Sequence, residues 1–271
     1  MTEAVGTIVR SWRQRRRLSQ QALSERTGVS TRHLSYIETG RSTPSRDMVG
    51  KLGEALQIPL RAQRSLYSAA GFAPSASQFD LKAPALRHVN DAIEAILQGH
   101  HPYPALVIDG GWDLVAANDA TYALLADLPP ELLEPPVNVV RLTLQPGGLR
   151  ERIANFASWS QGITHRIRHE YESTADERLG RLLTEITRLV PETARHSKAD
   201  PDIVLTLRLR TGDDVLSFFT TTTVFGTPSD VTVADLAIEA LYPADDATRQ
   251  YLSSPSTQIP PRSAYEGSTG G

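Results

Sequence analysis

The sequence contains no cysteine. Disulfide bonds, thiolate zinc sites and cysteine nucleophiles are therefore excluded, and the composition is compatible with a reducing compartment. No apolar run approaches the ~20 residues that a membrane span needs. The N-terminus also lacks the charged and then apolar pattern of a signal peptide. We therefore expect a cytoplasmic protein with no membrane partner.

Charge is distributed unevenly along the 271 residues, although the net charge is only −3. Residues 1–70 contain twelve Lys and Arg against five Asp and Glu and carry +7, whereas the remaining 201 residues carry −10. The length suits about two domains. A small basic module joined to a larger acidic one predicts a polyanionic partner for the first module alone. Scatter is the alternative, because Arg15, Arg16 and Arg17 supply much of the excess.

The first seventy residues predict short helices separated by clear capping residues. Ser19 and Ser30 are N-cap candidates, and Gly28 and Gly40 are placed to end the helices that precede them. Apolar residues recur at helical spacing in the segments between these residues. Five helices are predicted, over residues 5–16, 20–27, 31–38, 46–56 and 59–70.

The second and third predicted helices are joined by a short turn that contains Gly28, which is the pattern of a helix-turn-helix. In such a motif the second helix enters the major groove of DNA, and its first exposed side chains reach the edges of the bases. Backbone N–H groups at helix N-termini contact phosphates. The motif therefore predicts double-stranded DNA as the polyanionic partner.

The run LSQQALSERTGVSTRHLSYIETGRSTPS, residues 18–45, closely resembles the phage-repressor-like helix-turn-helix family, also called XRE or Cro/C1. The resemblance implies that Arg13 on the first helix pairs with Glu38 at the end of the recognition helix. That pair is expected to be structural, because it locks two helices together and does not face the bases.

The outward residues of the third helix are the candidate base readers, and Arg32 is foremost because a guanidinium binds guanine O6 and N7 bidentately. Gln20 is expected on the backbone or on an outer base. A solvated surface side chain is the alternative for each residue. The candidate DNA contacts are Thr31, Arg32 and Tyr36 for bases, Gln20 as described, and Ser30, His33, Ser35 and Arg41 for phosphates.

A change to small and polar residues over 68–84 indicates a join between two domains. We expect a DNA-binding domain over 1–72, a linker over 73–84 and a second domain over 85–252. Residues 253–271 are rich in Ser, Pro and Gly and are expected to be disordered.

The second domain mixes two hydrophobic periods. A helix is predicted at about 85–97, followed by a hairpin of strands 105–109 and 113–117 around Gly110 and Gly111, and by a helix over 120–125 that Asn118 caps. A helical stretch from about residue 156 breaks into two, the second part over 176–189. Strands at 203–210, 215–225 and 236–241 precede a short final helix. The predicted fold class is α+β: a five-helix helix-turn-helix domain followed by a PAS-like antiparallel sheet with helices over one face.

Three runs carry a second resemblance: HHPYPALVIDGGWDLVAAN, NVVRLTLQPGGL and FFTTTTVFGTPSDVTVADLAIEALYPADDAT. They are similar to the ligand-binding domain of MmyB-like actinobacterial regulators. With the N-terminal match, the resemblance covers about residues 5–250. It implies a PAS-like domain and a fatty-acid-type ligand.

A pocket between the sheet and its helices is therefore expected, since small-molecule sites are mostly apolar with a few polar groups. Arg141 is the cation that we expect beside a ligand carboxylate, although it could instead bind Asp109 or a backbone carbonyl. Plain core packing is the alternative for the aromatic candidates. These are Trp112, Phe156, Trp159, Phe218 and Phe219.

Enzymatic motifs are missing from the second domain: we find no G-x-S-x-G, P-loop or dinucleotide fingerprint. His165 and His169 have metal-ligand spacing, but the intervening Arg-Ile-Arg lacks the glutamate of HExxH. We expect no enzyme, no metal and no cofactor. The prediction is a transcription regulator that binds DNA as a homodimer and senses a small hydrophobic ligand. The alternatives are a ligand-free dimerisation or protein-interaction module and an enzyme attached to a DNA-binding domain.

Overall fold

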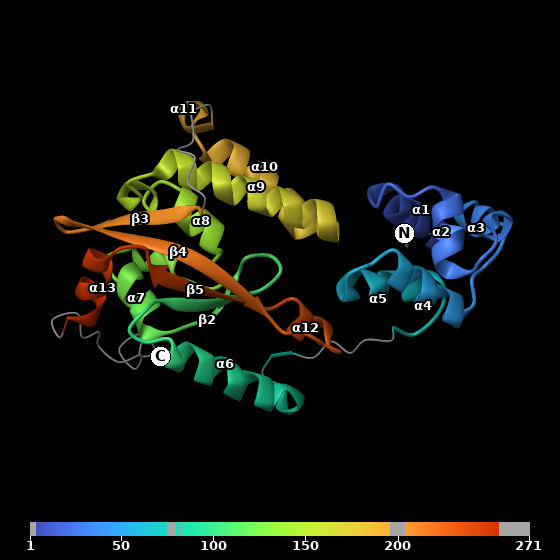
Figure 1. Cartoon of the computed structure of the whole chain (residues 1–271), viewed down its shortest axis with the longest axis horizontal. Helices are drawn as coiled ribbons and strands as arrows, with labels where there is room; N and C mark the ends of the chain where they lie inside the picture. The colour runs from blue at the N-terminus through green and yellow to red at the C-terminus, as the bar shows by residue number, and fades with distance from the viewer. Residues whose placement is uncertain (1–3, 75–79, 82, 196–203, 255–271) are drawn as a thin grey trace. The chain divides into compact units, whose positions relative to one another are not determined.

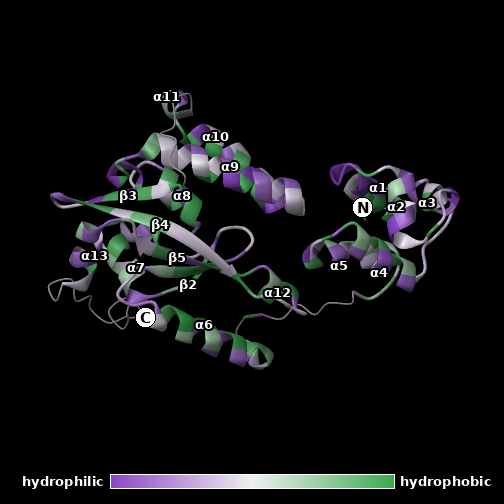
Figure 2. Cartoon of the chain, viewed as in Figure 1, coloured by the Kyte–Doolittle hydropathy of each residue, from purple (hydrophilic) through white to green (hydrophobic). Residues whose placement is uncertain are grey.

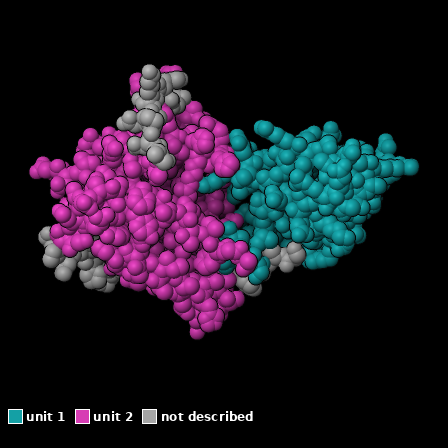
Figure 3. Space-filling model, in the orientation of Figure 1, with its two compact units in different colours: residues 1–79, 170–176, 228–234 teal, residues 80–169, 177–227, 235–271 magenta. Residues whose placement is uncertain are grey.

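The structure is a computed structural model, which describes residues 4–74, 80–81, 83–195 and 204–254. These residues belong to two compact units, coloured separately in Figure 3. The first comprises residues 1–79, 170–176 and 228–234, and the second comprises 80–169, 177–227 and 235–271. The boundaries at 72, 84 and 252 stay predictions. Most of the tail for which disorder is predicted lies outside the described residues.

The first unit contains the five predicted helices, close to their predicted bounds. Ser19 accepts a hydrogen bond from the Ala22 N–H and Ser30 accepts one from the His33 N–H, so both are N-caps. Gly28 adopts φ 70° at the end of the second helix, a left-handed conformation that glycine adopts without strain. The helices are α1 (Val5–Arg15), α2 (Gln20–Thr27), α3 (Thr31–Glu38), α4 (Arg46–Ala55) and α5 (Leu60–Ala69) (Figure 1).

The core of this unit is formed by fully buried aliphatic side chains from all five helices, including Val9, Leu23, Leu34, Leu52 and Leu66. The α1 and α3 backbones also approach each other closely. A Cβ atom built on Gly6 of α1 would overlap the carbonyl oxygen of Ile37 on α3. The absence of a side chain at Gly6 therefore sets the distance between α1 and α3.

A five-stranded antiparallel sheet forms the centre of the second unit, with strand order β2-β1-β5-β4-β3. The predicted hairpin is present as β1 and β2, and the two strands predicted on either side of Gly212 also pair, as β3 and β4. One row of the sheet pairs Leu106 with Glu239 and Glu239 with Thr222, so these three residues share one face. The strands are β1 (Ala105–Ile108), β2 (Leu114–Ala117), β3 (Thr206–Thr211), β4 (Asp214–Val224) and β5 (Ala237–Pro243).

Helices lie on both faces of this sheet (Figure 1). Ile93 and Leu97 of α6 (Arg87–Gly99) pack against Val107 and Ile238 on one face. Hydrophobic and hydrophilic positions alternate along α6, as expected for a helix with one buried side (Figure 2). The opposite face is covered by α8 (Val139–Leu144), α9 (Phe156–Thr174) and α10 (Glu177–Leu189). The sequence predicted helices over one face of the sheet only. The structure also has α6 on the second face.

The remaining helices of the second unit are short. The predicted cap Asn118 accepts a hydrogen bond from the Thr121 N–H at the start of α7 (Asp119–Leu125). The final helix, α13 (Asp246–Ser253), was also predicted, whereas α8 and α11 (Glu192–Arg195) were not. The short helix α12 (Val231–Ala234), which belongs to the first unit, was not predicted either. Within the described ranges, no helix combines the length and apolar character of a membrane span.

Candidate functional site

The recognition helix α3 has one buried side and one accessible side. Leu34 and Ile37 are fully buried in the core of the unit. Thr31 and Arg32, at the N-terminal end, are exposed, while Tyr36 one turn later is half-buried. The candidate base readers therefore lie on the side of α3 that faces away from the core.

Arg32 and Tyr36 contact each other along this accessible side. The Arg32 Nε–H donates to the Tyr36 hydroxyl at 3.0 Å, and the guanidinium carbon lies 5.5 Å from the centre of the tyrosine ring. A cation stacked on an aromatic ring samples fewer rotamers than a free arginine. In the protein without DNA, Tyr36 therefore already orients Arg32, the foremost candidate for base reading, on the surface of α3.

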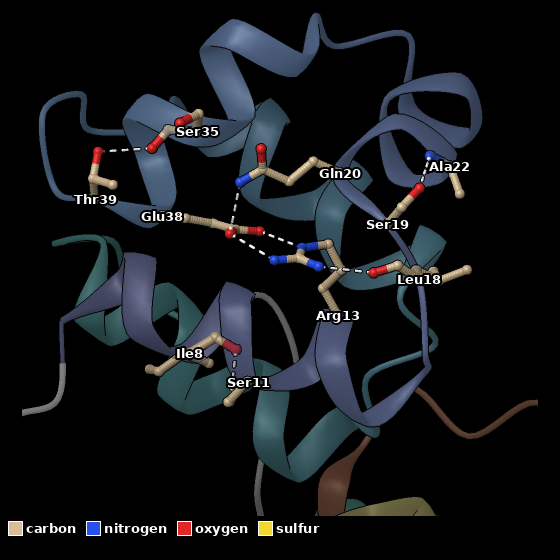
Figure 4. A network of polar contacts seen from close by, with 10 residues as sticks. All are labelled: Ile8, Ser11, Arg13, Leu18, Ser19, Gln20, Ala22, Ser35, Glu38 and Thr39. Carbon is tan, nitrogen blue, oxygen red and sulfur yellow. Dashed lines mark hydrogen bonds and ion pairs between the residues drawn. The ribbon is translucent and has the colours of Figure 1, made fainter.

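Arg13 and Glu38 form a bidentate ion pair between α1 and α3 (Figure 4). The Arg13 Nε–H and one terminal N–H donate to the two carboxylate oxygens at 2.6 and 2.9 Å, and the side chains are only 12% and 3% exposed. Arg13 also donates to the Leu18 carbonyl at 2.8 Å. The guanidinium therefore ties α1 both to α3 and to the turn before α2.

The same carboxylate orients Gln20. The Gln20 side-chain N–H donates to Glu38 at 2.9 Å, so that residues of α1, α2 and α3 meet at one anion (Figure 4). Burial raises the pKa of Glu38, but the hydrogen bonds from Arg13 and Gln20 and the charge of Arg13 outweigh it, so the pKa lies below its ordinary value. The hydrogen bond to Glu38 likewise raises the pKa of Arg13.

The candidates for phosphate contacts are distributed from the N-cap of α3 to the residues just beyond its C-terminus. Ser30 caps its N-terminus, and the His33 ring nitrogen Nε2 lies 3.4 Å from the Ser42 hydroxyl. Ser35 is half-buried and accepts a hydrogen bond from the Thr39 hydroxyl through its carbonyl, while Arg41 is exposed just beyond the helix. Assignment of these residues to phosphates remains a prediction.

The second unit contains a cavity of about 420 Å³ between the sheet and the α8–α9 side. Its size is within the range of small-molecule sites. Aliphatic side chains make most of the wall. They include Leu106, Leu207, Leu209 and Leu241 of the sheet, Val140 and Leu142 of α8, and Ile163 of α9.

Two of the six predicted ligand contacts, Trp112 and Trp159, line this cavity. The other four are placed elsewhere. Phe218 is fully buried but is not part of the wall, and Phe219 stacks on Tyr242 with ring centres 5.5 Å apart. Phe156 lies under the guanidinium of Arg150 at 5.1 Å.

Arg141 is also placed outside the wall of the cavity. Its Nε–H donates to both carboxylate oxygens of Glu185 on α10, at 2.8 and 2.9 Å. Asp109, which the sequence offered as an alternative partner for Arg141, instead pairs with Arg178 at 2.7 Å. Arg141 is therefore satisfied by a side chain of its own domain.

The charged residues of the cavity wall, Arg166 and Glu239, were missed by the sequence analysis. Two Arg166 N–H groups donate to the two Glu239 oxygens at 2.6 and 3.0 Å, and the guanidinium carbon lies 4.5 Å from the centre of the Trp112 ring. A lone carboxylate inside the apolar strand sequence AIEALYP was the available signal for Glu239, because an unpaired charge is costly to bury.

His165 and His169, which have the spacing of metal ligands, lie in different surroundings. His165 contributes to the cavity wall, whereas His169 does not. No group of three or more metal-ligating side chains occurs among the described residues.

Comparison with known proteins finds matches for two segments of the chain. Residues 89–254 match the family model of the MmyB-like transcription regulator ligand-binding domain, and residues 9–63 match a helix-turn-helix model. Two proteins named uncharacterized HTH-type transcriptional regulators, from two strains of Mycobacterium tuberculosis, are each 38% identical over 53 residues. That match covers 20% of this chain and 38% of each relative. The similarity to them is thus confined to a segment the size of a helix-turn-helix domain.

Proposed function

Because the chain belongs to the MmyB-like transcription regulators, we propose that it recognises a specific operator as a homodimer and responds to a small hydrophobic ligand in its cavity. The observation that carries the ligand half is the wall itself, which is aliphatic and aromatic over most of its extent. A fatty acid is the ligand class that the family resemblance implies. A second domain that only dimerises the protein is the competing proposal.

The DNA half of the proposal rests on α3. Its accessible side presents Thr31, Arg32 and Tyr36, and Glu38 holds the helix against α1 and orients Gln20 of α2. Phosphate contacts come from the exposed cations and from the helix N-termini, so affinity should fall with salt by ~0.9 log units in K per log unit of salt for each phosphate neutralised.

Substitution of Arg32 tests base reading. Arg32→Ala should cost about 1–3 kcal/mol on the selected operator and relax specificity at one base pair. Arg26→Ala, which removes an exposed arginine of α2, serves as the control and should leave the sequence preference unchanged. The measurement is selection of binding sites from random duplexes, followed by titration. An equal loss on every duplex would make Arg32 a phosphate contact.

Dimer formation is tested by sedimentation of the full chain with and without the selected duplex. One helix-turn-helix covers one half-site, and related dimers bind half-sites ~34–36 Å apart. Two copies per duplex on an inverted repeat are expected. A single copy on a single half-site would contradict the dimer.

Ligand binding is tested by the thermal stability of the full chain in titrations with aliphatic alcohols and acids. A saturable rise is expected, because a ligand that binds only the folded state stabilises it by mass action. Trp159→Ala, which removes a wall residue, should weaken the response, whereas Phe156→Ala, outside the wall, is the control. The absence of any saturable response would favour the dimerisation module.

A further inference from the structure

The polar part of the cavity wall already carries balanced charge. Glu239 accepts two hydrogen bonds from Arg166 and one from the Thr222 hydroxyl at 2.9 Å, and Thr222 also accepts from Arg166 at 3.1 Å. The Glu239 side chain is 6% exposed. The pairing of β4 with β5 places Thr222 beside Glu239 on the same face of the sheet. The one arginine and the one carboxylate of the wall are therefore committed to each other.

A charged ligand group beside the Arg166–Glu239 pair would meet a charge of its own sign. A carboxylate that approached Arg166 would have to displace Glu239 or lie beside it, and two adjacent carboxylates repel each other in a weakly screened environment. An ammonium group would meet Arg166 in the same way. Displacement of Glu239 by a carboxylate would leave Glu239, whose side chain is 6% exposed, without its partner, and an unpaired buried carboxylate is strongly unfavourable.

Two other basic side chains of the domain do not provide an alternative within the wall. His165 belongs to the wall but is exposed, so a contact there would involve a group that water already solvates. Arg141 lies outside the wall and pairs with Glu185. A carboxylate inside the cavity would therefore lack a buried cation.

We propose that the cavity selects an uncharged amphiphile: an aliphatic chain that ends in a hydroxyl or a comparable neutral polar group. A hydroxyl can accept a hydrogen bond from Arg166 and donate one to Glu239 without separating them. The Thr220 hydroxyl, in the wall two residues before Thr222, is a further neutral partner. This inference rests on the proposed ligand-binding function and replaces the fatty acid by a neutral chain of the same shape.

The test compares decanol with decanoate, which share an alkyl chain and differ in charge. Both are titrated below their aggregation limits into the full-length protein, at a pH where decanoate is ionised, by calorimetry and by thermal shift. Decanol is expected to bind more tightly than decanoate by about tenfold or more, since an uncompensated carboxylate is penalised in an apolar site.

Glu239→Gln provides the second measurement. The amide keeps the size of the side chain but leaves Arg166 as an uncompensated cation, so decanoate should gain affinity and the preference should reverse. Glu185→Gln is the matched control, because it removes the partner of Arg141 outside the cavity and should leave the preference for decanol unchanged.

The possible outcomes distinguish the selection of an uncharged ligand from the proposed ligand-binding function on which it rests. Tighter binding of decanoate by the natural protein would overturn the selection of an uncharged ligand and leave ligand sensing intact. Saturable binding of neither molecule would overturn the proposed ligand function, and the inference with it. The comparison in the natural protein decides the question even if Glu239→Gln fails to fold.

Discussion

The ion pair between Arg13 and Glu38 allows a quantitative prediction about the stability of the DNA-binding domain. Glu38→Gln keeps the shape of the side chain and removes its charge, so Arg13, with only 12% of its side chain exposed, would lose its counter-ion. Breaking a buried pair by removing one partner costs roughly 3–5 kcal/mol. The residual exposure of Arg13 and its bond to the Leu18 carbonyl place the expected loss at the lower end, about 3 kcal/mol.

Hydrogen exchange of the full-length protein, resolved by peptide, measures this loss in α1 and α3 directly. The matched control is Asp47→Asn, which breaks the Asp47–Lys51 pair on α4, where the side chains are 78% and 56% exposed. An exposed pair of this kind contributes about 0.3–0.5 kcal/mol. Equal, small effects of the two substitutions would refute the argument that burial makes the Arg13–Glu38 pair energetically important.

The pair also gives this domain an acid sensitivity with a definite sign. The pKa of Glu38 is lower in the folded state than its ordinary value of 4.5, because the bonds from Arg13 and Gln20 outweigh burial. Stability from this group is therefore fully present above pH 4.5 and is lost as pH falls below that value toward the folded-state pKa. Glu38→Gln should abolish that part of the pH dependence.

Two further predictions concern packing and titration. Gly6→Ala should destabilise α1 and α3 by about 1–3 kcal/mol, because the new Cβ would overlap the Ile37 carbonyl oxygen, whereas Gly53→Ala on α4 meets only ordinary contacts and should be neutral or stabilising in the same exchange experiment. Burial lowers the pKa of His100 below 6.5, more than its backbone bond to Leu241 raises it, so the urea midpoint of the C-terminal domain should fall as pH drops below 6.5. His100→Gln should flatten that profile while His88→Gln, at an exposed position, should not; a profile that His100→Gln leaves unchanged would assign the dependence to another group.

Most secondary structure could be predicted because local signals agree with the tertiary fold. Ser19, Ser30 and Asn118 cap helices in the structure where the sequence places caps, and the turn at Gly110–Gly111 separates two paired strands. The short helices α8 and α12 were missed, because segments of six and four residues are too short to display a helical period. The loops around them contain few local signals.

The residues that line the cavity were harder to predict than the helices and strands. Trp112 and Trp159 line the cavity and Phe218 does not, although all three are large aromatic residues in the expected part of the chain. Composition identifies residues that become buried, but whether a buried side chain borders a void depends on how distant segments pack. Arg141 illustrates the same difficulty, because its partner Glu185 lies 44 positions away.

Glu38 and Glu239 show why one buried carboxylate was found and the other was not. Each lies in an apolar context, each is under 10% exposed and each is held by an arginine from another element. Glu38 stands in a motif whose resemblance names its partner, whereas nothing local connects Glu239 with Arg166. A well-packed apolar side chain would often stabilise such sites equally or better, so stability alone is a weak reason for a buried pair. What both pairs supply is position: Glu38 fixes Gln20 at the start of α2, and Glu239 fixes Arg166 over Trp112 at the cavity wall.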